Sequence, residues 1–185
     1  MNEIICSGLG GQGVLVAGEI IADIAMEDGK NVSWYPSYGF EMRGGAANCE
    51  LKIGDEDLQS PYCLEPDILY TLSESAIDTF EERLKPGGVL LVNSSIVSED
   101  RKYREDIKVI KVPATDIANE AQNARGTNIV MLGAMAAASD LYDVDHVRAG
   151  MDNYFGKKGK NNPKNDICFN RGAEEAMKQL EATNE

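Results

Sequence analysis

The sequence lacks the local patterns that mark a metal centre, a membrane span or a nucleic-acid surface. Its four cysteines, Cys6, Cys49, Cys63 and Cys168, lie far apart and never form C-x-x-C. The sequence therefore has no local motif for a zinc site or an iron–sulfur cluster. No apolar stretch reaches the length of about 18 residues that a membrane helix needs. The excess of 31 acidic over 18 basic residues gives a net charge of −13, which repels nucleic-acid phosphates. We therefore expect no metal site in this chain, and neither a membrane nor a nucleic acid as its partner.

Catalytic groups are also scarce. The only histidine, His146, falls in a predicted helix without partners, and no nucleophile–base pair is visible. The N-terminal MNEIICSGLGGQG has no basic segment or cleavage site of the kind that starts a secretory signal. These absences predict a cytoplasmic chain without catalytic residues of its own, whose cysteines are reduced and mostly buried.

Length and periodicity predict one α/β domain spanning residues 1–185. Strands are expected at 4–6, 32–35, 47–53, 67–72, 89–92 and 107–112, and helices at 14–26, 74–84, 116–124, 128–139, 144–155 and 166–180. Their alternation favours a mainly parallel, doubly wound, Rossmann-like sheet flanked by helices.

Several local expectations accompany this order. Pro36 should stop the second strand, which completes an opening βαβ unit. The strand at 47–53 alternates apolar and polar residues, so it should have one wet face. Ser73 should cap the helix that follows it, Thr115 or Asp116 the helix to 124, and the apolar helix 128–139 should press a broad face against the sheet.

The richest chemical signal is the turn G-L-G-G-Q-G between the first strand and the first helix. It contains Gly8, Gly10, Gly11, Gln12 and Gly13. Glycines allow the sharp turn and the close approach of peptide N–H groups to an anion at the helix N-terminus. A phosphate or diphosphate is the natural ligand, although close strand–helix packing without a ligand would use the same glycines.

Two enzyme classes share such a turn. A dinucleotide site needs an acidic residue at the end of the second strand, and Asp28 lies before that strand instead, so an NAD dehydrogenase is disfavoured. An adenylating enzyme would also begin in this way, but its magnesium-binding and C-x-x-C motifs are missing.

A second candidate segment is S-Y-G-F-E-M-R-G-G-A-A-N-C, residues 37–49, where Glu41 and Arg43 precede Gly44 and Gly45. It follows the second strand, where open α/β sheets place ligand-binding loops. The guanidinium of Arg43 could grip a phosphate or a partner's carboxylate with two hydrogen bonds, or the segment could be a tight connection with solvated charges.

Both segments, together with Ser60-Pro61, Pro113-Ala114-Thr115 and the stretch N-I-V-M-L-G-A from Asn128, resemble the gamma subunit of the 2-oxoacid:ferredoxin oxidoreductases that act on pyruvate, 2-oxoglutarate and 2-oxoisovalerate. The resemblance covers nearly the whole chain. It implies oxidative decarboxylation of a 2-oxoacid to acyl-CoA with ferredoxin as electron acceptor. The form of the motifs looks most like the 2-oxoglutarate or 2-oxoisovalerate branch, and 2-oxoglutarate ranks first.

The resemblance also implies a division of labour. Alpha, beta and ferredoxin-like delta subunits would hold thiamine diphosphate, magnesium and iron–sulfur clusters, whereas this chain holds none of them and completes the complex. Coenzyme A is the expected ligand of the glycine turn, with Glu41, Arg43, Gly44 and Gly45 as further contacts. The lysines of the loop GKKGKNNPKN could add a coenzyme A phosphate or subunit contact, or form a solvated face. A scaffolding subunit without a ligand is the alternative.

Overall fold

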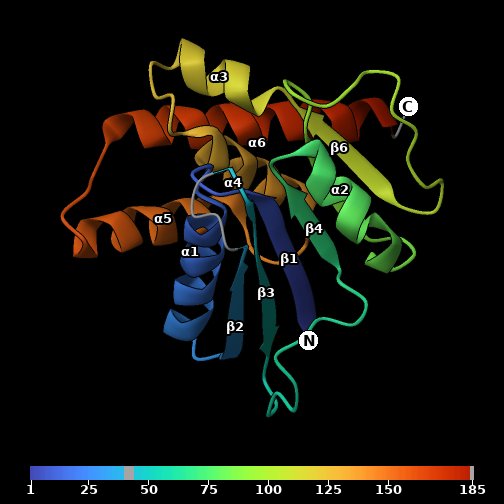
Figure 1. Ribbon diagram of the computed structural model, residues 1–185. Helices are drawn as coiled ribbons and strands as arrows, with labels where there is room; N and C mark the ends of the chain where they lie inside the picture. Colours follow the sequence, from blue (N-terminus) through green and yellow to red (C-terminus); the bar gives the residue numbers. More distant parts are fainter. Residues whose placement is uncertain (40–43, 184–185) are drawn as a thin grey trace.

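The computed structural model of the chain describes residues 1–39 and 44–183, in which six strands form one sheet in the order β2-β3-β1-β4-β5-β6 (Figure 1). The strands are β1 (Asn2–Leu9), β2 (Asn31–Tyr38), β3 (Ala46–Gly54), β4 (Ile68–Thr71), β5 (Val89–Asn93) and β6 (Lys108–Val112). Strands β1, β4, β5 and β6 are parallel, whereas β3 pairs antiparallel with both β1 and β2.

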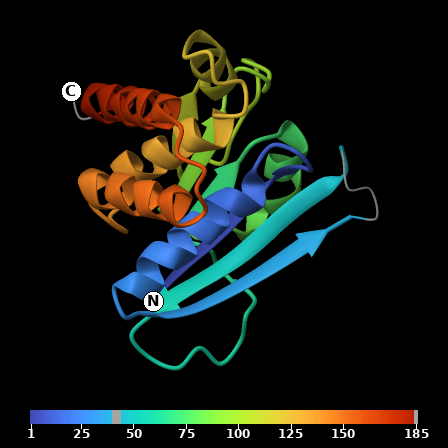
Figure 2. The same ribbon diagram turned by 90° about the vertical axis from the view of Figure 1, so that its left-hand side faces the viewer.

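Helices cover both faces of this sheet (Figure 2). They are α1 (Val14–Glu27), α2 (Glu74–Phe80), α3 (Ala114–Glu120), α4 (Thr127–Ala138), α5 (Val144–Lys157) and α6 (Pro163–Thr183), and a 3₁₀ turn (Glu81–Arg83) extends α2. The larger apolar core lies between one face of the sheet and helices α1, α3, α4, α5 and α6. A smaller apolar core lies between the other face of the sheet and α2. The predicted α/β fold, with a mainly parallel sheet between helices, is thus confirmed.

The opening of the chain differs from a simple βαβ unit, because β3 is inserted between β1 and β2. Strand β2 also continues through Pro36 to Tyr38, so the prediction that Pro36 stops it is wrong. The N–H of Gly39 donates to the carbonyl of Ala46 (3.0 Å), and the alternation of an antiparallel ladder then puts the nitrogen of Pro36 on the free edge. An edge strand tolerates proline there, since no ladder hydrogen bond is lost.

Strand β3 has no wet face along most of its length. As whole residues, Glu50 and Lys52 are 8% and 6% exposed, although the alternation of polar and apolar residues predicted solvent contact. The segment 55–67 runs back over this part of the sheet and covers both side chains, which bond its backbone. Their charged partners are Glu3 on β1 for Lys52 and Arg83 for Glu50. The prediction was therefore wrong because a loop, which has no periodic signal, covers the polar face.

Helix ends show one confirmed cap and one unexpected one. The hydroxyl of Ser73 accepts from the N–H of Ala76 (3.3 Å), as predicted for α2. Helix α3 begins at Ala114, so Thr115 and Asp116 lie inside its first turn and are not its cap. The side-chain oxygen of Asn93, at the end of β5, accepts from the N–H groups of Ala114 and Thr115 (3.2 and 3.3 Å) and satisfies that turn instead.

Helix α4 is buried almost all round, because α6 covers the side that faces away from the sheet. Two glycines allow the close contact between these helices. A Cβ at Gly133 would lie 2.0 Å from the carbonyl oxygen of Phe169, and a Cβ at Gly172 would lie 1.9 Å from that of Val130. Within the described ranges, no helix combines the length and apolar character required to cross a membrane.

Candidate functional site

The glycine turn lies at the carboxyl end of β1 and leads into the N-terminus of α1. Gly11 and Gly13 have φ angles of 98° and 78°, in the left-handed region that side chains disfavour. Gly13 is the N-cap residue of α1, and no side-chain cap bonds the first turn of this helix among the described residues. The N–H groups of Val14, Leu15 and Val16 have no partner within the helix, as in any first turn, so they are available to a ligand.

The side chain of Gln12 holds the turn in place. Its oxygen accepts from the N–H of Leu9 (2.7 Å), and its nitrogen donates to the carbonyl of Leu72 (2.9 Å) just beyond β4. Gln12 was predicted to contact a ligand, but these two hydrogen bonds occupy both ends of its amide within the protein. Its visible role is to fix the turn against the neighbouring strand.

A further residue, Asn128, holds the glycine turn in place. The amide nitrogen of Asn128, in the first turn of α4, donates to the carbonyl of Gly13 (3.1 Å), and the buried hydroxyl of Tyr70 donates to the carbonyl of Asn128 (2.7 Å). Asn128 was not among the predicted site residues, although it opens the stretch N-I-V-M-L-G-A that the family resemblance includes. Asn128 is 115 residues from Gly13 along the chain, so the sequence alone could not predict this contact.

The structure brings the two predicted segments together. The N–H of Gly10 donates to the carbonyl of Gly45 (2.8 Å), and the N–H of Gly44 approaches the carbonyl of Gly10 (3.4 Å). The end of the β2–β3 hairpin therefore lies against the glycine turn. Glu41 and Arg43, the charged members of the second segment, lie outside the described residues.

A hollow of about 380 Å³ lies where these segments meet. It is lined by Leu9, Gly10, Gly11, Gly13, Val14, Leu15, Val16, Tyr38, Gly45, Ala46 and Ala47. Most of this wall is apolar, and Tyr38 contributes the one ionisable side chain among these lining residues. The arrangement suits a ligand with an anionic group for the helix N-terminus and an apolar portion for the wall. It offers no general acid–base pair for catalysis.

The basic loop lies elsewhere. Lys157 pairs with Asp23 and Glu27, near the C-terminal end of α1, and Lys158 pairs with Glu19. Because α1 has 14 residues and rises about 1.5 Å per residue, the ion pairs of Lys157 lie well away from the glycine turn. The hydrogen bonds that Lys157 donates to the carboxylates of Glu27 and Asp23 raise its pKa. These two lysines are thus neutralised within the chain and are not brought to the hollow.

The thiols and the histidine do not form a second site. All four cysteines are free and buried. Burial, followed by the carboxylates of Glu3 and Glu50, raises the pKa of the Cys63 thiol to about 12. His146 contacts Asp28 (2.9 Å) and the ring of Tyr142 at the surface. Among the described residues, no group of three or more histidine, cysteine, aspartate or glutamate side chains is placed to hold a metal ion.

Comparisons with known proteins agree on one group. The chain matches the Pyruvate ferredoxin/flavodoxin oxidoreductase family over residues 3–175. It is 38% identical to the 2-oxoglutarate synthase subunit KorC of Methanocaldococcus jannaschii, over 95% of this chain and 94% of that protein.

Two solved structures share the fold. The keto/oxoacid ferredoxin oxidoreductase gamma subunit of Geobacter sulfurreducens PCA aligns with a TM-score of 0.79 and 31% identity, over 96% of this chain and 99% of that one. The 2-oxoglutarate:ferredoxin oxidoreductase of Magnetococcus marinus, solved with 2-oxoglutarate, coenzyme A and succinyl-CoA bound, aligns with a TM-score of 0.83 and 22% identity. In that protein the same fold spans 31% of a longer chain, and 96% of this chain is covered.

Proposed function

Because this chain belongs to the pyruvate ferredoxin/flavodoxin oxidoreductase family and is a gamma subunit of a 2-oxoacid:ferredoxin oxidoreductase, we propose that its own task is to hold coenzyme A at the glycine turn. Such an enzyme oxidatively decarboxylates a 2-oxoacid, forms an acyl-CoA and passes the electrons to ferredoxin. The described residues that line its hollow include no acid–base pair, and in this proposal the chain contributes to the reaction by binding and orientation.

The observation that carries the proposal is the meeting of the turn and the hairpin end around a hollow of about 380 Å³. Coenzyme A has a diphosphate, a 3′-phosphate and long uncharged arms. Its diphosphate would accept hydrogen bonds from the first-turn N–H groups of α1, whose dipole also favours an anion. The apolar wall formed by Leu9, Val14, Tyr38 and Ala47 would contact the uncharged parts and exclude water around them.

Two further points support this ligand. The M. marinus enzyme, which contains the same fold, was solved with coenzyme A bound. Arg43 and Glu41 follow the hairpin strand that lines the hollow, and we propose Arg43 as an additional phosphate contact, since its planar guanidinium can donate two parallel hydrogen bonds.

The rest of the chemistry belongs to partner subunits in this proposal. Thiamine diphosphate with magnesium would supply the electron sink for decarboxylation, and iron–sulfur clusters would carry single electrons to ferredoxin. Alpha, beta and ferredoxin-like delta subunits would hold these groups, and residues 1–185 would act beside them as one domain.

We propose 2-oxoglutarate as the substrate of the complex, on the strength of the 38% identity to a 2-oxoglutarate synthase subunit. The assembled enzyme should reduce ferredoxin faster with 2-oxoglutarate than with 2-oxoisovalerate or pyruvate. A higher kcat/KM for either competitor would replace this assignment without affecting the coenzyme A site.

The decisive test of the site compares Leu15→Glu with Leu15→Gln in the assembled complex. Both variants remove the same apolar contact, but only glutamate puts a carboxylate beside the N–H groups of the first turn. A carboxylate is favourable at a helix N-terminus, so folding should not suffer. It should compete with a bound phosphate and weaken coenzyme A about tenfold more than glutamine does, which corresponds to roughly 1.4 kcal/mol.

The titration would include coenzyme A without its 3′-phosphate and NAD as comparison ligands. We expect NAD not to compete, because the turn lacks the acidic partner of a ribose hydroxyl. If Leu15→Glu and Leu15→Gln bind coenzyme A equally well, the chain is a scaffolding subunit without a ligand.

A further inference from the structure

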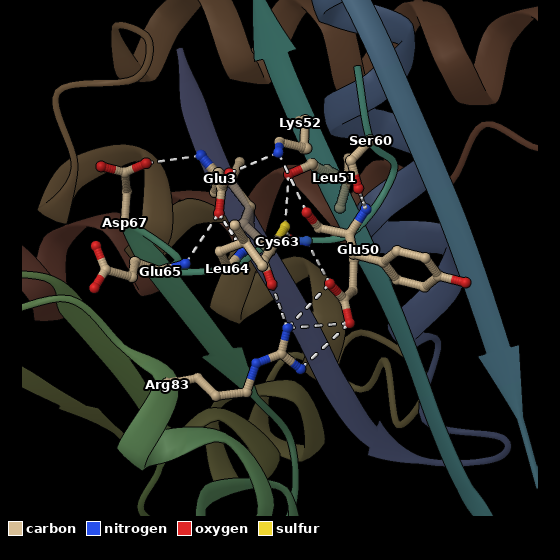
Figure 3. A network of polar contacts seen from close by, with 12 residues as sticks. Glu3, Glu50, Leu51, Lys52, Ser60, Cys63, Leu64, Glu65, Asp67 and Arg83 are labelled. Carbon is tan, nitrogen blue, oxygen red and sulfur yellow. Dashed lines mark hydrogen bonds and ion pairs between the residues drawn. The ribbon is translucent and has the colours of Figure 1, made fainter. Parts of the chain in front are cut away.

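Three charged side chains, those of Glu3, Glu50 and Lys52, are enclosed between the sheet and the segment 55–67, on the face opposite α1, and a fourth, that of Arg83, is 36% exposed and joins them (Figure 3). Glu3 on β1 pairs with Lys52 on β3 (2.8 Å), and the two side chains are 11% and 8% exposed. Glu50 on β3, whose side chain is 10% exposed, pairs with Arg83 from the 3₁₀ turn (3.2 Å). The coenzyme A site proposed above involves none of these four residues.

These charges bind the main chain of residues 62–65. The carboxylate of Glu3 accepts from the N–H groups of Leu64 (2.7 Å) and Glu65 (3.2 Å), and that of Glu50 accepts from the N–H of Cys63 (2.6 Å). In the other direction, Lys52 donates to the carbonyl of Tyr62 (3.2 Å), and Arg83 donates to that of Cys63. Five hydrogen bonds with charged side chains, four of them with the buried Glu3, Glu50 and Lys52, therefore fix four consecutive residues.

Stability alone is a weak reason for such an arrangement. Removing ions from water is costly, and a buried ion pair is often no more stabilising than apolar residues of the same volume. Charged side chains form directional hydrogen bonds, and each bond specifies where a backbone N–H or carbonyl must lie. The network thus sets the conformation of 62–65 more strictly than apolar packing would.

The fixed segment presents apolar side chains to solvent. Cys63 points inward and is 1% exposed, whereas Tyr62 and Leu64 on either side of it are 50% and 76% exposed. The ring of Tyr62 meets that of Tyr35 on the edge strand β2 at a centroid distance of 5.0 Å, and Tyr35 is 40% exposed. We call Tyr35, Tyr62 and Leu64 the apolar ridge.

The segment that carries most of this ridge has only acidic charges. The segment 55–67 contains five acidic residues and no lysine or arginine. Asp55, Glu56, Asp57 and Glu65 are exposed, and Asp55 forms an ion pair with Lys30. An apolar centre that includes tyrosine, held rigidly and bordered by charge, has the composition of a protein-binding surface and involves little ordering cost on association.

We propose that the apolar ridge docks into another subunit of the same oxidoreductase, in an apolar recess bordered by lysine and arginine. The inference rests on the assignment of this chain as a subunit of that complex, and it identifies the surface by which it is held. Charge complementarity selects this occupant over a second copy of the chain, because two acidic borders would repel each other. In the M. marinus relative the fold is part of a longer chain, which fits a unit that functions against neighbours.

The test measures the affinity of this chain for the complex of the remaining subunits, using the purified full-length proteins. Leu64→Asp should weaken binding at least about tenfold, since a carboxylate would be desolvated in the apolar recess. Ile167→Asp on α6 is the control, because Ile167 is another exposed aliphatic residue (48%) but lies on α6, outside the ridge. Its affinity should equal that of the wild type. Tyr62→Ser provides a second, uncharged disruption.

The charge argument adds an independent readout. Wild-type affinity should fall as salt is raised, and Glu65→Lys should weaken binding while Leu64 is intact. Wild-type affinity of both Leu64→Asp and Tyr62→Ser would overturn the proposal. So would a dimer of the isolated chain that Leu64→Asp dissociates without any effect on the other subunits.

Coenzyme A affinity, measured on the same preparations, separates this inference from the proposed ligand. A wild-type complex that assembles through the ridge but does not bind coenzyme A would refute the ligand alone. Failure of the wild-type chain to bind any of the other subunits would refute the assembly and the ridge together.

Discussion

The close contact between α4 and α6 leads to a sharp prediction for Gly133→Ala. The added methyl group would lie 2.0 Å from the carbonyl oxygen of Phe169, whereas ordinary van der Waals contact begins near 3.4 Å. The helices would have to separate by roughly 1.4 Å, the difference of those distances. Neither helix can yield cheaply, because the obstacle is backbone and α4 is enclosed between the sheet and α6.

Overpacking of a core typically costs about 1–3 kcal/mol, and a backbone obstacle should bring Gly133→Ala to the upper end of that range. For a chain of this length, about 3 kcal/mol corresponds to a fall in Tm of roughly 6–12 °C. Urea and thermal unfolding of the isolated chain, followed by circular dichroism, would measure both quantities.

The control is the same substitution at Gly156 on α5. Gly156 is exposed, and its nearest atom would be Asn161 Oδ1 at 3.7 Å, so Gly156→Ala should stabilise the chain by about 0.5–1 kcal/mol through helix propensity. The reasoning is refuted if Gly133→Ala changes the free energy of unfolding by less than about 0.5 kcal/mol, since the helices would then accommodate the methyl group without strain.

Four other predictions follow from particular features. Burial raises the pKa of Glu19, but hydrogen bonds from Tyr154 and Lys158 outweigh it and lower the pKa below 4.5. Glu19→Gln should therefore reduce stability by less than about 1 kcal/mol at neutral pH, and urea titrations should show the difference vanish as the pH falls through the folded pKa. The four buried thiols should not react with a thiol reagent at pH 8 until the chain unfolds; rapid native labelling of Cys63 would contradict its raised pKa. The isolated chain should be colourless, contain no iron by elemental analysis, and fail to reduce ferredoxin or viologen dyes with any 2-oxoacid. Arg43→Ala should leave thermal unfolding unchanged but lower the activity of the assembled complex, with poor rescue by Arg43→Lys; full activity would return this segment to a solvated connection.

Periodic patterns in the sequence predicted most of the helices and strands. The apolar run of β1, the glycine turn and the amphipathic or apolar helices were predictable because their patterns are local. The position of β3 between β1 and β2 was not, since strand order depends on contacts between distant residues. The burial of Glu50 and Lys52 was also not predicted, because the segment that covers them has no periodic pattern and its contact with β3 is a tertiary one.

The candidate site was likewise predictable only in part. Gly10, Gly13, Gly44 and Gly45 were identified from their chemistry, and the structure brings the turn and the hairpin end together. The hydrogen bond from Asn128 to the turn joins parts of the chain that only the tertiary fold makes neighbours. Gln12 was predicted as a ligand contact, and its hydrogen bond to the carbonyl of Leu72 could not be predicted from the sequence, because Leu72 is 60 residues away along the chain.

The central place of β1 in the sheet has a consequence for synthesis on the ribosome. Strand β1 pairs with β3 and β4, so its apolar residues lack these strand partners until about residue 70 has left the exit tunnel. Helix α6, which covers α4, begins only at Pro163. The nascent chain therefore exposes apolar surface over the synthesis of this whole stretch, and it is open to aggregation until α6 closes the larger core.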